Sequence, residues 1–143
     1  MAYIPPNAVW YTAELVFEIT VEKSGRNVVH RNLLLIRAAS PDEAYSRAIE
    51  LGKVSEIEYR NPSGKQVHIA FRGLSKLSVI YDPLDHGAEL LFEEIVDLPE
   101  KELMDLIPAK TCLAVFRPIE KSIGPDYSSK DALEQAKRIL RGK

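Results

Sequence analysis

The chain has 143 residues, of which 45% are hydrophobic and 28% charged, and these values fit one globular domain. Nineteen Lys and Arg against 21 Asp and Glu give a formal charge of −2, which argues against nucleic-acid binding by the chain as a whole. The single cysteine, Cys112, excludes an internal disulfide and a cysteine-only metal cage, and it favours a reducing compartment. The longest apolar run, residues 33–36, is far too short to cross a bilayer, and the N-terminus lacks the apolar core of a secretory peptide. We therefore expect a soluble, cytoplasmic, single domain over residues 1–143 that does not bind membranes.

The N-terminal third predicts a β-hairpin. After an N-terminal arm at residues 1–8, apolar and polar residues alternate over 11–22, which is typical of a long strand with one face in water. A turn at residues 23–27 leads into a second strand at 28–38. The run at 33–36 is apolar on both faces, which favours an interior position for this second strand.

A helix is predicted at residues 41–52, because Ser40 can cap it, Pro41 suits its first turn and Glu43 can complete a capping box. Gly52 can end it in a left-handed conformation. The helix should cover one face of the sheet with its apolar residues, which are Ala44, Tyr45, Ala48, Ile49 and Leu51.

The rest of the chain predicts further strands and two short helical segments. A strand near residues 56–60 is followed by a turn at 61–64 and a long strand at 65–80, in which Gly73 marks a bulge or bend. Strands are also predicted at 88–93 and 111–117, and a helix at 99–107 after an Asp97 start, with Leu103, Leu106 and Ile107 as its apolar stripe. An extended connection at 118–128 precedes a terminal helix from about residue 129 with basic residues at its end. The expected fold class is α+β, with a mainly antiparallel sheet of five or six strands, one helix packed on a face and a C-terminal helix.

No catalytic motif accompanies these elements. The chain has no Gly-x-Ser-x-Gly elbow, no phosphate loop and no Gly-x-Gly-x-x-Gly, so no cofactor is expected. Cys112 has no histidine beside it and is interpreted as a buried structural thiol. The three histidines are scattered, so no metal site is predicted, although His68, His86 and Asp85 form an alternative ligand or active-site cleft if the bend at Gly73 brings them together.

The alternating glutamates of the first strand form the other candidate site. Trp10, Glu14 and Glu18 share one face of that strand, whereas Tyr11 belongs to the apolar face. Such glutamates usually mark a solvated sheet face, but with an exposed Trp they can also form an acidic platform for a basic partner protein. A homo-oligomer through an open strand edge is compatible with either hypothesis.

Several short motifs, taken in order, resemble the bacterial domain-of-unknown-function family number 4288 over about residues 9–95. They are Trp10-Tyr11, residues 32–38, residues 42–45 with Ala48 and Gly52, residues 61–65, residues 71–74 and residues 87–90. The resemblance implies a small bacterial α+β domain without an assigned activity, so no catalytic residue is carried over. We expect a protein-interaction module without enzymatic activity, such as an immunity-type or regulatory binding partner. The alternative is a small ligand-binding domain or enzyme that uses the histidine and carboxylate cleft.

Overall fold

The computed structural model describes residues 3–119 and 123–129. These residues fall into two compact units, the first with residues 3–91 and 124–129 and the second with residues 92–119 and 123. Among the described residues, the first unit contains the sheet and a long helix, and the second contains one short α-helix and two 3₁₀ turns. A single domain over residues 1–143 stays a prediction.

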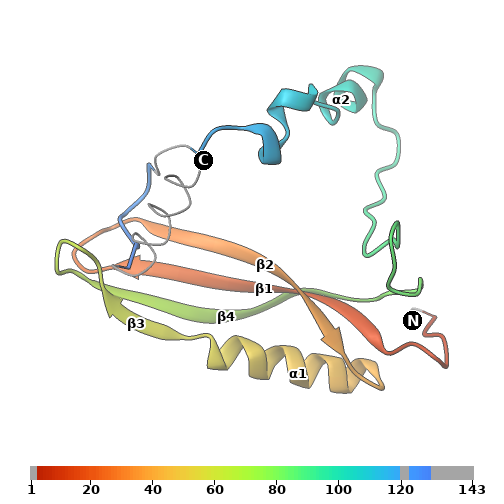
Figure 1. The fold of residues 1–143 in the computed structure, drawn as a ribbon, viewed down its shortest axis with the longest axis horizontal. Coiled ribbons are helices and arrows are strands. Elements are labelled where there is room, and N and C mark those ends of the chain that lie inside the picture. Colours follow the sequence, from red (N-terminus) through yellow and green to blue (C-terminus); the bar gives the residue numbers. More distant parts are fainter. Residues whose placement is uncertain (1–2, 120–122, 130–143) are drawn as a thin grey trace. The chain divides into compact units, whose positions relative to one another are not determined.

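The sheet of the first unit has four strands, β1 (Trp10–Val21), β2 (Asn27–Arg37), β3 (Ile57–Arg60) and β4 (Gln66–Val79). All neighbours are antiparallel in the order β2-β1-β4-β3, and Figure 1 shows β1, β2 and β4 as long, curved strands. The α+β class with an antiparallel sheet is confirmed. The expected five or six strands are wrong, because the described residues pair only four.

β2 lies at an edge of the sheet, so the prediction of an interior position is wrong. The run at residues 33–36 alternates between the two faces like any other strand, with Ile36 buried and both Leu33 and Leu35 exposed. Apolar residues on both faces of a strand concern what lies above and below the sheet. They do not show that a further strand is hydrogen-bonded along the edge.

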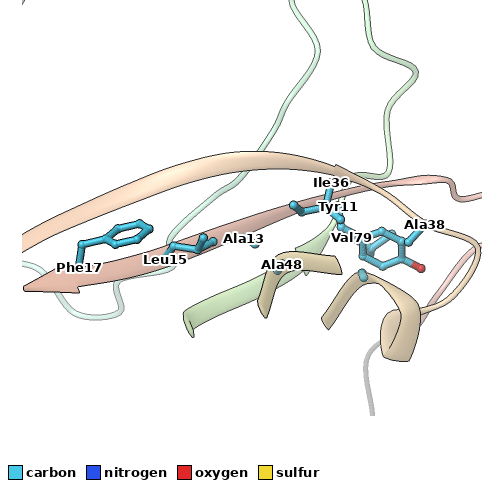
Figure 2. Packing of buried hydrophobic residues seen from close by; sticks show 9 residues of the cluster. Tyr11, Ala13, Leu15, Phe17, Ile36, Ala38, Ala48 and Val79 are labelled. Atoms are coloured by element: carbon cyan, nitrogen blue, oxygen red, sulfur yellow. The ribbon is translucent and has the colours of Figure 1, made fainter. Parts of the chain in front are cut away.

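The core lies between the sheet and α1 (Pro41–Val54). Directly paired residues of neighbouring strands share a face, so the odd-numbered residues of β1 face the same side as their partners Ile36 and Val79. Figure 2 shows Phe17, Leu15, Ala13 and Tyr11 in a row along β1, on the side where Ala48 of α1 lies. The buried members of this cluster are Tyr11, Ala13, Leu15, Phe17, Ile36, Ala38, Ala44, Ala48 and Val79.

α1 begins as predicted and packs through its smallest residues. The Ser40 hydroxyl accepts a hydrogen bond from the Glu43 N–H at 3.1 Å, which caps the helix. Ala44, Ala48 and Gly52 are buried at a spacing of four residues, whereas Tyr45 stays 53% exposed. The predicted apolar side of the helix is therefore only partly correct: Ala44 and Ala48 are buried, but Tyr45 and Leu51 are exposed. The small buried side chains let the helix lie close to the sheet.

Gly52 does not end the helix, which continues to Val54 and is capped by Ser55. The glycine instead lies directly against the ring of Phe71 on β4. A Cβ atom added at Gly52 would lie 2.5–2.6 Å from three ring carbons of Phe71. Glycine is thus required here for close packing of α1 on β4, not for a left-handed backbone.

Gly52→Ala should lower the free energy of unfolding by about 1–3 kcal/mol, because the added methyl group overlaps the Phe71 ring. This loss is expected even though alanine at an exposed helix position is favoured over glycine by roughly 1 kcal/mol. Urea denaturation measures the difference. In a Phe71→Leu background, which removes the aromatic ring, the same substitution should cost clearly less. A Gly52→Ala protein that is more stable than the parent would contradict the packing.

A second, smaller hydrophobic cluster lies on the same face of the sheet as α1, toward the end of β1. Ile19, Val21 and Val67 are buried there, and Tyr127 from the segment 124–129 packs against them. The Tyr59 hydroxyl donates to the Tyr127 carbonyl. This segment therefore covers the hairpin end of the face and contributes neither helix nor strand.

The predicted strands at 88–93 and 111–117 are absent, so both predictions are wrong. An alternating pattern yields a strand only where another strand offers its edge, and residues 88–93 pair with none of the described residues. Residues 111–117 instead form two short 3₁₀ turns, η1 (Lys110–Cys112) and η2 (Ala114–Phe116), closed by local bonds such as Leu113 N–H to the Lys110 carbonyl at 3.1 Å.

The second unit also contains α2 (Glu100–Asp105), which is shorter than the predicted helix at 99–107. It begins after Pro99 without a side-chain cap, so the predicted Asp97 start is wrong. Its expected apolar stripe is exposed, as is Cys112, which is therefore not the buried thiol we expected. Neither described helix has the length and apolar character that a bilayer span needs. The predicted terminal helix lies, beyond its first residue, outside the described residues.

Candidate interaction face

The face of the sheet opposite α1, here called the open face, carries the even-numbered residues of β1. It also carries their partners on the two neighbouring strands, because paired residues point to the same side. The structure places Trp10, Glu14 and Glu18 on this face, as the alternation in β1 predicts. From β2 the open face receives Asn27, Val29, Arg31, Leu33, Leu35 and Arg37.

Glu14 is the most highly connected residue of the open face. Its Oε1 atom accepts hydrogen bonds from Arg31 Nε at 2.5 Å and from the Ser75 hydroxyl at 2.7 Å. Lys76 lies opposite Glu14 in the pairing of β1 with β4. The Glu14 side chain is only 13% exposed, so its carboxylate is held inside the face rather than offered to a partner.

Irregular pairing between β1 and β4 brings the side chains of Ser75 and Arg72 close to the glutamates of β1. The register between β1 and β4 shifts at Glu14/Leu15 and again at Val16/Phe17, so that Arg72 and Ser75 oppose no residue of β1. Gly73, which lies between them with φ of 139°, supplies the backbone conformation. The predicted bulge at Gly73 is confirmed, and its consequence is that Ser75 reaches Glu14.

These contacts shift the acidity of Glu14. The hydrogen bond from Ser75, together with the bond and charge of Arg31, holds the pKa of the Glu14 carboxyl below its ordinary value of 4.5, although partial burial opposes the shift. A carboxyl whose pKa is lowered by folding stabilises the fold above its unfolded pKa. That contribution is lost as the pH falls through the folded pKa.

Glu14→Gln should therefore be less stable than the parent at neutral pH, and the difference should shrink as the pH is lowered below about 4.5. Urea denaturation at a series of pH values measures both proteins. Ser75→Ala removes the strongest cause of the shift, so it should retain the Glu14 carboxylate but weaken the pH dependence. A difference between parent and Glu14→Gln that does not change with pH would contradict the assignment.

Glu18 and Trp10 also have neighbours on the open face. Glu18 accepts a hydrogen bond from Asn27 Nδ2 at 2.7 Å, and Arg72 Nε lies 3.9 Å from its other oxygen. Trp10 is half-buried and lies under Arg37, whose guanidinium carbon is 5.6 Å from the ring centroid. The three predicted residues thus lie on one face, but each is already engaged by a side chain of this chain.

The alternative cleft is not assembled. His68 is exposed near the start of β4, with Nδ1 3.9 Å from Glu58 Oε1. The turn that carries Asp85 and His86 follows the other end of β4, and the Asp85 carboxylate accepts the His86 backbone N–H at 2.7 Å. With roughly 3.3 Å per strand residue, the length of β4 separates the two histidines. No group of three or more potential metal ligands occurs among the described residues.

An apolar stripe on β2 is the feature that sequence reasoning missed. Val29, Leu33 and Leu35 are 52%, 51% and 47% exposed on the open face. The signal was present in the run at residues 33–36, which we interpreted as the mark of an interior strand. On an edge strand these residues leave apolar surface on both sides of Arg31, with Val29 on one side and Leu33 and Leu35 on the other.

Comparison with known proteins adds one finding. The family model DUF4288, described as a domain of unknown function, matches residues 10–92, which include all four strands and α1. The resemblance noted from the sequence is thereby confirmed. Neither a curated protein nor a solved structure matches the chain.

Proposed function

The chain belongs to the DUF4288 family. From the open face of its sheet, we propose that it is a protein-interaction module without enzymatic activity. An immunity-type or regulatory binding partner is the role that suits it. The observation that carries the proposal is the apolar stripe of Val29, Leu33 and Leu35, exposed beside an ordered network of charges. Apolar surface rimmed by polar groups is typical of protein contact sites.

The charges around the stripe favour a partner with an acidic rim. Glu14 and Glu18 have four basic residues near them on the same face. These residues are Arg31, Arg37, Arg72 and Lys76. The sequence pattern alone favours a basic partner, because it shows the glutamates of β1 but not the cations that the fold brings beside them. With the glutamates paired, we propose a partner that offers carboxylates around an apolar contact.

Charge complementarity of this kind acts mainly on the rate of association. A favourable field raises the association rate at low salt, and the effect falls as ionic strength rises. Arg72 is the best probe, because its side chain is 64% exposed and its distance to Glu18 is long for an ion pair. Glu14 is a poor probe, because its loss would leave Arg31 and Ser75 without their acceptor.

The test uses the full chain as bait in its native host, followed by binding kinetics with the purified partner. Arg72→Glu should reduce the association rate at low salt, and the reduction should fade at high salt. Lys53→Glu makes the same charge change at an exposed position of α1 and should leave the rate nearly unchanged. Equal rates for the parent and Arg72→Glu at low salt would overturn the open face as the contact surface.

A further inference from the structure

β2 presents a long, regular edge of the sheet. Its 11 residues pair with β1 without a register shift, contain no proline and pair on their other side with no described strand. The opposite edge consists of β3, which has only four residues, among them Glu58 and Arg60, and of residues 70–79 of β4, which extend past β3. The bulge around Gly73 interrupts this part of β4. Short, charged edges resist pairing with another chain, whereas long, regular, apolar ones promote it. Among the described residues, β2 is therefore the long, regular edge that suits the addition of another strand.

The backbone groups that point outward from β2 follow from one hydrogen bond. The Ala38 N–H donates to the Val9 carbonyl at 2.9 Å. In an antiparallel pair, hydrogen-bonded positions alternate with positions whose N–H and C=O point away. The even-numbered residues of β2 therefore bond to β1, and the odd-numbered residues present their N–H and C=O groups outward. Val29, Leu33 and Leu35 thus bear both the outward-pointing backbone groups and the exposed apolar side chains.

We propose that the partner of this edge is β2 of a second copy of the chain, paired antiparallel about a two-fold axis at Asn32. In this register Val29 lies opposite Leu35 of the second copy on the open face. On the other face, Val28 lies opposite Ile36 of the second copy. Each of these apolar pairs occurs twice because the axis repeats it.

The side-chain pattern of β2 favours this register over its neighbours. Only shifts of two residues keep the odd-numbered residues in hydrogen-bonded positions. One such shift would place Arg31 opposite Arg31 of the second copy, and the other would place Val29 opposite Arg37. With the axis at Asn32, Arg31 lies opposite Leu33, and its charge remains balanced by Glu14 within its own chain.

The two-fold pairing also explains why assembly would stop at two copies. Each copy offers one long, regular edge, and the dimer uses both of them to form a continuous sheet of two four-stranded halves. The edges left over are, in each copy, the short β3 strand and the bulged residues 70–79 of β4, and bulges also hinder pairing with another chain. The open faces of both copies then lie on one side of the joined sheet.

The first test is the solution mass of the full chain, which should be about twice 16.1 kDa by sedimentation equilibrium. Val29→Lys with Leu35→Lys sets lysines opposite each other, so this variant should be monomeric, as should Val29→Glu with Leu35→Glu. Mixed together, the two variants should form a heterodimer. Tyr45→Lys with Val54→Lys, which changes two exposed apolar residues of α1, should leave the dimer intact. A monomeric parent, or mixed variants that stay apart, would overturn the pairing.

A cross-link tests the register. In a Cys112→Ser background, Asn32→Cys places two thiols opposite each other at a non-hydrogen-bonded pair, where the Cα spacing of about 4.5 Å permits a disulfide. Val29→Cys places its two thiols six strand positions apart and should not cross-link. Oxidised dimer from Val29→Cys but not from Asn32→Cys would refute the register. Arg72→Glu lies away from this edge and should keep the dimer, so failure of the contact face and failure of the dimer are distinguishable.

Discussion

Leu15→Ala should lower the free energy of unfolding by about 2–5 kcal/mol, the largest loss expected for a single side chain of the sheet. Leu15 is completely buried in the cluster between β1 and α1. Its removal both forfeits the burial of apolar atoms and leaves a cavity in a closely packed cluster, where the surrounding side chains relax only in part. Chemical denaturation followed by circular dichroism measures the loss.

Val16→Ala is the matched control, because Val16 follows Leu15 on the same strand but faces the opposite side of the sheet. Val16 is half-buried on the open face. Its truncation should cost less than about 1.5 kcal/mol, since only two carbon groups of partly exposed surface are lost. Equal losses for the two variants would show that the core is not confined to the α1 side.

Local patterns were sufficient for the elements whose own residues decide them. Alternation in β1 predicts both its length and its two faces, and Ser40 with Pro41 predicts the start of α1. The turn at residues 61–64 likewise follows from Asn61 and from Gly64, which has φ of 81°. In each case the stabilising contact lies within a few residues of the sequence signal.

Predictions failed where the outcome depends on a distant part of the chain. The edge position of β2 depends on β4 pairing with the other side of β1, which no residue of β2 reveals. Gly52 looks like a helix terminator until Phe71, 19 residues later, is placed against it. The strand-like pattern of residues 88–93 had no edge to join.

In the candidate site, too, local sequence patterns predict some features and distant residues decide the others. Alternation placed Trp10, Glu14 and Glu18 on one face, but their charge environment comes from other strands. Arg31 and Ser75, the two donors to Glu14, lie 17 and 61 residues away in the sequence. An acidic surface was therefore expected where the structure has paired charges. The apolar stripe, rather than the glutamates, becomes the stronger argument for a contact surface.

Asn61→Ala should cost about 2–4 kcal/mol of unfolding free energy, because it removes three hydrogen bonds made by one buried side chain. Asn61 is 6% exposed, and its Oδ1 atom accepts the N–H groups of Ser63 at 3.0 Å and Lys65 at 2.9 Å. Its Nδ2 atom donates to the Asp126 carbonyl at 3.0 Å. One residue thus closes the β3–β4 turn and holds the segment 124–129. Thermal and urea denaturation measure the loss.

Asn61→Asp separates these two roles. The aspartate retains an oxygen for the two turn bonds, but it loses the donor to Asp126 and places a carboxylate beside that carbonyl. Amide exchange at Ser63 and Lys65 should therefore stay slow, while exchange in residues 124–129 should become faster. Uniform acceleration at both places would show that the turn and the segment are not held separately.

Tyr59→Phe provides the complementary variant, because it removes a second hydrogen bond to the segment and leaves the turn bonds unaltered. Burial raises the pKa of the Tyr59 phenol above its ordinary value of 10.0, so the hydroxyl remains a donor to the Tyr127 carbonyl throughout the neutral range. Its loss should accelerate exchange in residues 124–129 with little effect at Ser63. If Asn61 and Tyr59 hold the segment together, the double variant Asn61→Asp with Tyr59→Phe should release it more than the two single effects combined.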